Sequence, residues 1–336
     1  MLRREKRASV KDILKVITGI LLIVVSGCMP DAKRDNPFDP KSEGYSDEGR
    51  LTGRVTRIYR PSEGIEGVTV SLNPPGSSSL TDGDGFYTID NIPSGTIEVI
   101  ARKSGYAQDS MTVEIVAGQS HAANFSLDGL PYFLDIRIGS EHDRPSPSDD
   151  RYFFHFEAQV NDPDGLSDID SAVVRVEALG FRKELILIPN TNRFSLTVSA
   201  EEIAGESLEA LVGKEVVFSA WDRIGLRSDA PPEHLVRIIH PSPSTVTPSE
   251  QEVVDSQPLL VWAAFSAPFT FTYTVDVKNA FSSGWHREGI PPDTTSVTVS
   301  DPLDSRWSHY WAVWVVDEFG NISKSPYVTF WVGGER

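Results

Sequence analysis

The residues TDGDGFYTIDNIPSG, at positions 81–95, decide how the first folded part of the chain is interpreted. Asp and Gly at this density are typical both of calcium-binding loops and of tight β-hairpins. Asp82 and Asp84 stand at positions one and three of an EF-hand loop, but position five is Phe86 and no Glu stands at position twelve. An EF-hand is therefore excluded, and a turn between two strands is the better interpretation.

Apolar residues alternate on both sides of this stretch, as expected of half-buried strands. The run GVTVSLN precedes it at positions 67–73, and GTIEVIARKSGY follows at 95–106. The pattern T-D-x-x-G-x-Y-x-I-x-N-I-P-x-G, at this distance from GVTV and SGY, resembles the carboxypeptidase regulatory-like domain, a transthyretin-like β-sandwich. The resemblance covers residues 49–128 and implies a non-catalytic sandwich in which Gly83 and Gly85 help to turn the chain.

The rest of the chain also indicates an all-β fold, because short apolar runs are separated by Gly, Pro, Asn or Asp. The run RYFFHFEAQV places Tyr152, Phe154 and Phe156 on one face of a strand. This is the pattern of an immunoglobulin-like sandwich, which we place at 131–240. We therefore predict three tandem β-sandwiches, the third at 241–333.

The last of these domains resembles a fibronectin type III domain. The resemblance implies that Trp262 is the core tryptophan of the second strand and that Tyr310 opens the family's Y-x-V-x-V strand. This alignment sends Ala312 and Trp314 to the core and leaves Trp311 on the side that meets water.

A short repeat links the second and third domains. Asp222-x-x-Gly225-x-x-Ser228 recurs as Asp317-x-x-Gly320-x-x-Ser323, each time directly after an apolar strand. The recurrence predicts that both domains use the same hairpin turn.

The amino terminus has the features of an export signal, with basic residues followed by an apolar run from Val16 to Val25. This run is too short to span a bilayer, which needs about 20 residues. It ends in VSGC, which resembles the lipobox of bacterial lipoproteins, and Cys28 is the only cysteine in the sequence. The resemblance implies a signal peptide of residues 1–27 and attachment of diacylglycerol and acyl chains such as palmitate at Cys28.

Residues 28–48 are polar and rich in Pro and Asp, which predicts a flexible tether. Met29 rather than Asp follows the lipid cysteine, which favours the outer membrane of a bacterial cell envelope. The formal charge of the sequence is −17, and removal of residues 1–27, with six basic and two acidic residues, makes it −21. Such a chain repels nucleic acid. We therefore expect a lipid-anchored protein whose partner is an envelope protein, an extracellular ligand or a polysaccharide.

No signature of catalysis is present in the sequence. It contains no G-x-S-x-G turn and no H-E-x-x-H motif, and the sole cysteine is expected to carry lipid. We therefore predict no catalytic residues and no enzymatic activity.

Four further carboxylates, in the run DPDGLSDID, are candidates for a calcium site: Asp162, Asp164, Asp168 and Asp170. The run fails the EF-hand pattern because Leu166 occupies position five. Turn formation accounts for Asp and Gly here as well, so we expect no metal and no other cofactor.

Six of the seven tryptophans fall in the last domain. An apolar outer face needs a cover, which a neighbouring domain or strand, a protein partner or stacked sugar rings could supply. Trp285, Trp307 and Trp311 are the candidates for a partner or glycan surface. The sequence thus predicts a lipid-anchored spacer or protein-binding, adhesive arm. The alternative is a carbohydrate-binding accessory lipoprotein.

Overall fold

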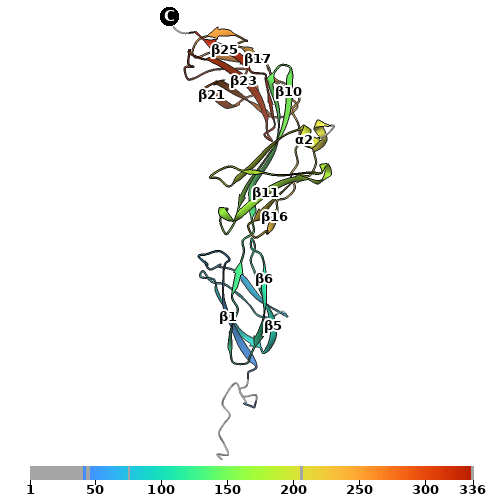
Figure 1. Cartoon of the computed structure of the whole chain (residues 1–336), viewed down its shortest axis with the longest axis vertical. Helices are drawn as coiled ribbons and strands as arrows, with labels where there is room; N and C mark the ends of the chain where they lie inside the picture. Colours follow the sequence, from blue (N-terminus) through green and yellow to red (C-terminus); the bar gives the residue numbers. More distant parts are fainter. Residues whose placement is uncertain (1–40, 43–45, 75, 205–206, 334–336) are drawn as a thin grey trace, which may run out of the picture. The chain divides into compact units, whose positions relative to one another are not determined.

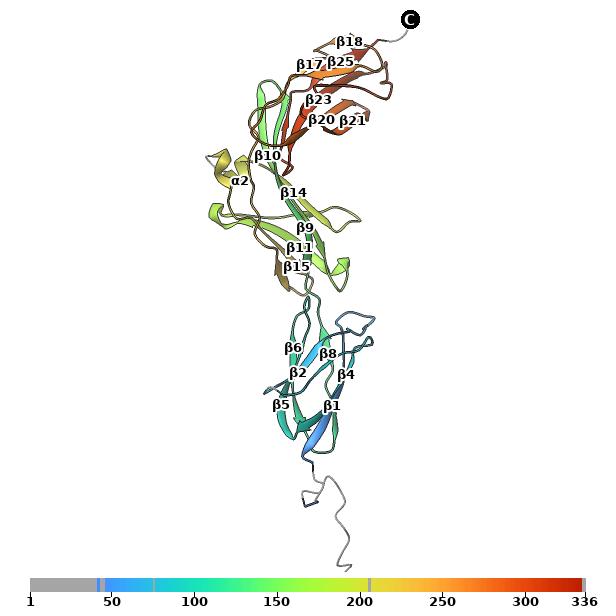
Figure 2. The same ribbon diagram turned by 180° about the vertical axis from the view of Figure 1, so that it is seen from behind.

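The computed structural model describes residues 41–42, 46–74, 76–204 and 207–333, which divide into two compact units (Figures 1 and 2). The first unit consists of the described residues up to Thr56, Glu63–Ala101 and Asp109–Phe125. The second consists of Arg57–Ser62, Arg102–Gln108 and the chain from Ser126 onward. The predicted signal peptide, Cys28 and nearly all of the tether lie outside the described residues. None of the helices within the described ranges has the length and hydrophobicity of a bilayer span.

The fold is all-β, as the sequence predicts. The first eight strands form two sheets, with strand orders β4-β1-β7 and β3-β2-β5-β6, and β8 also pairs with β1. β1 runs antiparallel to β4 and parallel to β7. The strands are β1 (Glu48–Arg57), β2 (Thr69–Asn73), β3 (Ser78–Leu80), β4 (Phe86–Pro93), β5 (Gly95–Arg102), β6 (Asp109–Ile115), β7 (Ser120–Ala122) and β8 (Phe125–Leu127).

The stretch at 81–95 forms the turn before β4 and then β4 itself. Asp82 Oδ1 accepts hydrogen bonds from the backbone N–H groups of Asp84, at 3.0 Å, and Phe86, at 2.8 Å. Gly85 has a φ of 82°, a conformation that glycine adopts without a steric penalty. The aspartate at the head of this stretch therefore shapes a turn, as the sequence predicts.

Alternate residues of the strands fill the core of this first sandwich, as the two-residue period of β-strands requires. The fully or nearly fully buried members include Leu51, Val55, Val68, Val70, Tyr87, Ile89, Val99, Ala101 and Phe125.

The second unit contains two hydrophobic cores and three sheets. Two smaller sheets have the orders β12-β11-β15-β16 and β17-β19-β22, and the largest follows β13-β14-β10-β9-β24-β23-β20-β21, with β25 on β23 and β18 on β25. Its strands are β9 (Tyr132–Ser146), β10 (Asp149–Asn161), β11 (Ile169–Val176), β12 (Phe181–Glu184), β13 (Ile186–Leu187), β14 (Arg193–Ser199), β15 (Val217–Asp222), β16 (Arg227–Asp229), β17 (Thr245–Thr247), β18 (Glu252–Val254), β19 (Leu259–Trp262), β20 (Phe271–Asn279), β21 (Ser282–Ile290), β22 (Ser296–Thr298), β23 (Ser308–Asp317), β24 (Ile322–Lys324) and β25 (Val328–Val332). Helical turns lie at α2 (Glu201–Ala204), Leu166–Asp168, Glu177–Leu179 and Leu208–Leu211.

The first core of this unit is built on the alternating strand β10. Phe154 and Phe156 are fully buried and Tyr152 packs against them, so the predicted inner face of this strand is confirmed. The second core contains Trp262, as the fibronectin resemblance implies.

The predicted orientation of β23 is wrong. Trp311, Val313 and Val315 are fully buried in the second core, whereas Ala312, Trp314 and Val316 lie on the outer face, where Ala312 is buried and the other two are half-buried. The residues on one strand face recur every two positions, so an alignment offset by a single residue exchanges the two faces completely.

One continuous sheet joins the two cores. β24 runs parallel to β9, with Ile322 opposite Glu141 and Ser323 opposite His142. The two sandwiches of the second unit therefore share backbone hydrogen bonds, in addition to the linker between them.

Candidate functional site

The same four-residue turn occurs three times in the described structure. Like Asp82, Asp222 and Asp317 each accept two backbone N–H hydrogen bonds through Oδ1, at 2.8–3.0 Å. Gly225 and Gly320, three residues further on, have φ angles of 92° and 83°. The predicted hairpin repeat of the second and third domains is confirmed. The first sandwich carries a third copy of the turn at Asp82, where Thr88 replaces the serine of the repeat.

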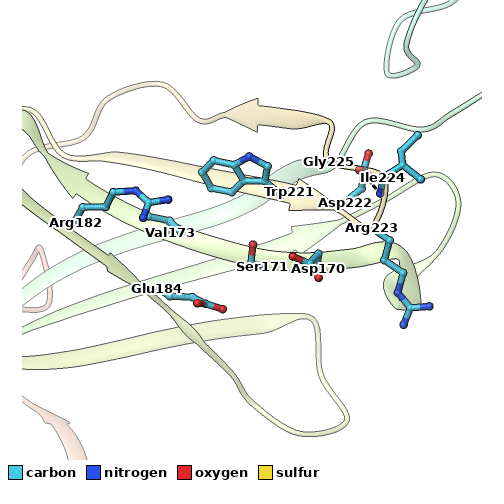
Figure 3. A pocket seen from close by; sticks show the side chains of 10 residues that line it. All are labelled: Asp170, Ser171, Val173, Arg182, Glu184, Trp221, Asp222, Arg223, Ile224 and Gly225. Carbon is cyan, nitrogen blue, oxygen red and sulfur yellow. Dashed lines mark hydrogen bonds between the residues drawn. The ribbon is translucent and has the colours of Figure 1, made fainter.

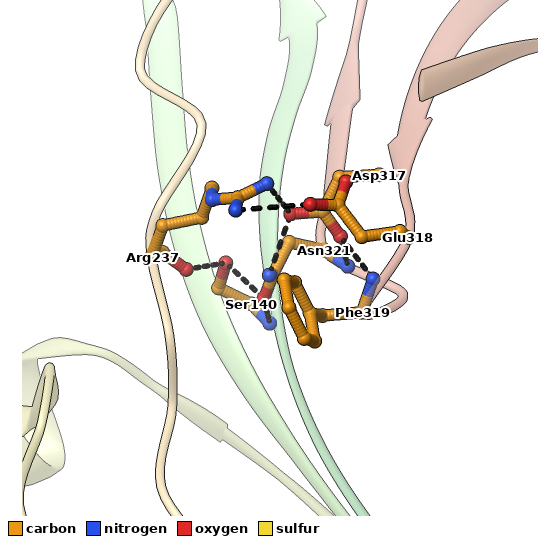
Figure 4. Close-up of polar contacts among 6 residues, drawn as sticks. All are labelled: Ser140, Arg237, Asp317, Glu318, Phe319 and Asn321. Atoms are coloured by element: carbon orange, nitrogen blue, oxygen red, sulfur yellow. Dashed lines mark hydrogen bonds and ion pairs between the residues drawn. The ribbon is translucent and has the colours of Figure 1, made fainter. Parts of the chain in front are cut away.

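The second carboxylate oxygen of this turn has a different environment in each copy. Asp317 Oδ2 accepts hydrogen bonds from Arg237 Nη1, at 3.0 Å, and from the Asn321 side-chain amide, at 2.9 Å. Asn321 Oδ1 in turn accepts hydrogen bonds from the Ser140 backbone and hydroxyl (Figure 4). Arg237 also donates to Glu318. This buried network fastens the end of the β23–β24 hairpin to β9.

Asp222 Oδ2, by contrast, is buried and has no hydrogen-bond partner. It belongs to a group of five carboxylates in the second unit, which we call the Asp cluster: Asp128, Asp162, Asp164, Asp168 and Asp222. Oxygens of Asp128, Asp164 and Asp168 all lie within 4.8 Å of one another. Carboxylates packed this closely repel one another strongly unless a cation or protons intervene.

The chain holds the Asp cluster in place through backbone hydrogen bonds. Asp162 Oδ1 accepts from Asp164 N at 2.7 Å, and Asp164 Oδ2 accepts from Gly129 N at 2.6 Å. Arg223 N donates to the backbone carbonyl of Asp168. Asp162, Asp164 and Asp222 thus each use one oxygen for a backbone contact and leave the other without a hydrogen-bond partner.

Electrostatics within the Asp cluster are unfavourable to ionised carboxylates. Burial, with the neighbouring charges of Asp222, Asp168 and Asp164, raises the pKa of Asp128 to about 7. Burial is also the main cause that raises the pKa of Asp162 to about 6. Interaction with the Asp168 carboxylate raises the pKa of the Tyr59 hydroxyl, which is buried beside it.

Three of the four sequence candidates for a metal site lie in the Asp cluster, namely Asp162, Asp164 and Asp168. Asp170 is exposed and lines a different groove, together with Trp221, Arg223 and Arg182 (Figure 3). Asp128 and Asp222 were not among the sequence candidates, because only the tertiary fold brings them to this loop.

The tryptophan candidates have separate environments. Trp311 is fully buried and donates its indole N–H to the Pro248 carbonyl, so the prediction that it faces solvent is wrong. Trp285 is buried and donates to the Ser300 hydroxyl. Trp307 is 40% exposed and lies against Phe281, with 4.1 Å between ring centroids.

The outer face of β23 is covered by side chains of neighbouring strands. Lys324 on β24 and Lys278 on β20 lie over the Trp314 ring, with their Nζ atoms 4.6 and 5.9 Å from its centroid. His286 on β21 packs edge-on against the same ring. Adjoining strands thus supply the cover that an apolar outer face requires.

A Ser–His–Asp chain occurs where β9 and β24 pair. Ser323 Oγ lies 3.2 Å from His142 Nδ1, and His142 Nε2 lies 2.9 Å from Asp150 Oδ1. However, Ser323 is fully buried, and its hydroxyl donates to the Pro241 carbonyl at 2.9 Å. A nucleophile needs both an accessible oxygen and a base free to take its proton, so this arrangement serves to join the two strands.

Comparison with known proteins identifies the first sandwich. Residues 50–128 match the family of carboxypeptidase regulatory-like domains. The first sandwich is a carboxypeptidase regulatory-like domain. Its turn at Asp82 and Gly85, which connects β3 in one sheet to β4 in the other, lies within the matched region. A search among curated proteins finds no match to the chain.

Several solved structures show a distant likeness. The FN1–FN3 domains of chicken CNTN1 are 10% identical over 81% of this chain and 93% of their own, with a TM-score of 0.31. BcpA, the major pilin subunit of Bacillus cereus, is 10% identical over 84% and 94%, with a TM-score of 0.28. A DUF3823 family protein from Bacteroides ovatus is 9% identical over 56% and 98%, with a TM-score of 0.26. Similarity at this level carries no argument about the function of this chain.

Proposed function

We propose that this protein is a non-catalytic, lipid-anchored arm of the bacterial cell envelope. Lipid at Cys28 holds one end at the membrane, favoured to be the outer membrane. The sandwiches then hold a protein-binding face away from the lipid surface. The carboxypeptidase regulatory-like domain is the first element beyond the tether.

The observation that carries the proposal is the continuous sheet of the second unit. An arm that holds its binding face at a fixed distance from the anchor must resist bending. A shared sheet resists bending far better than a flexible linker does. Ser140 and Asn321 reinforce the β9–β24 pairing through buried hydrogen bonds. The burial of Ser323 supports the non-catalytic part of the proposal.

Metabolic labelling with palmitate tests the anchor. We expect label in the full chain and none in Cys28→Ser, which should also move from the membrane fraction to the soluble fraction, because attachment of the chains that hold the protein requires the Cys28 thiol. A Ser26→Ala variant, in which the residue remains small, is the control and should keep the label. Label that persists in Cys28→Ser would contradict the proposal.

One observation favours carbohydrate binding as a second candidate function. Phe281 is 69% exposed and lies against Trp307 with the two rings tilted by 47°, so two aromatic side chains lie together at the surface of the last domain. Aromatic rings of this kind present an apolar face on which sugar rings can stack.

A glycan array probed with the full chain tests this candidate. We expect Trp307→Ala to weaken binding about two- to tenfold, since an aromatic contact contributes about 0.5–1.5 kcal/mol. Trp331→Ala is the matched control, because Trp331 is equally exposed (42%) but lies on β25. Equal losses in both variants, or no binding to any glycan, would rule out a sugar site at Trp307.

A further inference from the structure

The Asp cluster contains buried carboxylate oxygens without hydrogen-bond partners. Asp128 and Asp168 are only 4% and 3% exposed, and both oxygens of each are buried without a hydrogen bond. One further such oxygen comes from each of Asp162, Asp164 and Asp222. Burying an ionised carboxylate without a partner is among the costliest arrangements in a folded protein.

The positive charge near the Asp cluster neutralises only part of the cluster's negative charge. Arg57 Nη1 lies 3.9 Å from Asp164 Oδ1, and the same guanidinium bonds the Pro163 carbonyl. One guanidinium offsets one carboxylate of five. The equivalent turn at Asp317 shows the compensated form, because there Arg237 bonds the second oxygen directly.

We infer that the Asp cluster binds a divalent cation, with Ca²⁺ as the ion that its chemistry fits. Asp128, Asp164 and Asp168 are the central ligands, and Asp162 and Asp222 complete the shell. This site adds to the proposed arm and does not depend on it.

The geometry selects Ca²⁺ among common metals. Ca²⁺–oxygen distances are about 2.3–2.6 Å, so ligand oxygens around one ion lie within about 5 Å of one another, as those of Asp128, Asp164 and Asp168 do. Seven oxygens without a hydrogen-bond partner are offered, within the six to eight that Ca²⁺ takes. Mg²⁺ usually keeps several waters, and Zn²⁺ favours nitrogen and sulfur ligands.

The backbone contacts explain how such a site could be ready before the ion arrives. Asp162, Asp164 and Asp222 are each oriented by a hydrogen bond to one oxygen, which leaves the other oxygen for a ligand. Carboxylates fixed in this way lose little conformational freedom on binding.

Thermal unfolding of the full chain in detergent, in EDTA and then in Ca²⁺, tests the inference. We expect Ca²⁺ at about 100 times its Kd to raise the Tm of the second unit by roughly 5–10 °C. The same concentration of Mg²⁺ should do much less. Tb³⁺ in place of Ca²⁺ should emit on excitation at the Tyr absorption band, because Tyr59 lies beside Asp168.

Asp128→Asn and Asp168→Asn should remove both the Ca²⁺ response and the Tb³⁺ emission. In EDTA these variants should melt at or above the Tm of the unsubstituted chain, because each removes one repelling charge. If the aspartate had only a structural role, its substitution would lower the Tm in EDTA. Asp170→Asn is the control, because Asp170 follows the loop on β11 and is exposed, and it should behave as the unsubstituted chain does.

Three results would overturn the inference. The unsubstituted chain could show neither a Ca²⁺-dependent Tm nor Tb³⁺ emission, which would mean that protons alone neutralise the Asp cluster. Asp128→Asn could retain the full response, or Asp170→Asn could lose it to the same extent. If Mg²⁺ raised the Tm as much as Ca²⁺ does, the assignment to Ca²⁺ would be overturned.

Discussion

Gly85→Ala is expected to destabilise the carboxypeptidase regulatory-like domain by about 2–5 kcal/mol. A Cβ at this position would lie 2.2 Å from the Val55 carbonyl oxygen and 2.9 Å from Gly64 Cα, and φ is 82°. The left-handed conformation costs an alanine about 1–2 kcal/mol. The collision with rigid backbone adds a strain of about 1–3 kcal/mol.

The two other copies of the turn provide matched controls for this substitution. Gly225 and Gly320 have similar φ angles, but a Cβ on either would meet nothing within 4 Å. Gly225→Ala and Gly320→Ala should therefore cost only the conformational part, about 1–2 kcal/mol. Limited proteolysis should cleave the first unit of Gly85→Ala while the second stays intact. Equal stability of the three variants would contradict the role given to the crowded turn.

Arg237→Met is expected to weaken the junction between the two sandwiches of the second unit by about 2–3 kcal/mol. The Asp317 carboxylate is completely buried, and Arg237 is the cation that bonds it. Removing one partner of a buried ion pair costs about 3–5 kcal/mol, and we reduce this figure because the Arg237 side chain is partly exposed. Its guanidinium also lies over the rings of Phe269 and Phe319.

The expected drop in Tm for Arg237→Met is roughly 5–10 °C, measured by scanning calorimetry. Arg237→Lys should recover part of it, since a lysine keeps the charge but cannot bridge two carboxylates in one plane. Arg227→Met is the control, because Arg227 and its partner Asp229 are both solvent-exposed, and such pairs contribute about 0–1 kcal/mol. A change of similar size in the control would show that burial of Asp317 is not the cause.

The sequence predicts local turns well because their determinants are neighbours in the chain. Asp82, Asp222 and Asp317 each set their turn through residues within four positions. The orientation of β23 could not be predicted in the same way. Trp311 and Trp314 are both large and apolar, so the pattern leaves open which face is buried, and the fibronectin resemblance implies the opposite face to the one that the core contains.

The Asp cluster could be predicted only in part. Asp162, Asp164 and Asp168 share one loop, and their spacing marked them as candidates. Asp128 and Asp222 reach the same place from distant parts of the chain, and no spacing rule connects them. Their burial, which distinguishes a site from a solvated acidic loop, depends on packing that a pattern of residue types does not contain.

The parallel pairing of β9 with β24 also limits which parts of this chain can be exchanged between proteins as independent domains. A sandwich joined only by a linker can be exchanged, duplicated or lost as a unit. Here the edge of one sandwich is completed by a strand from the next, and Ser140 would lose its Asn321 partner if the two were separated. The natural unit of inheritance, and of any engineered graft, is therefore the pair of sandwiches from Tyr132 to Val332.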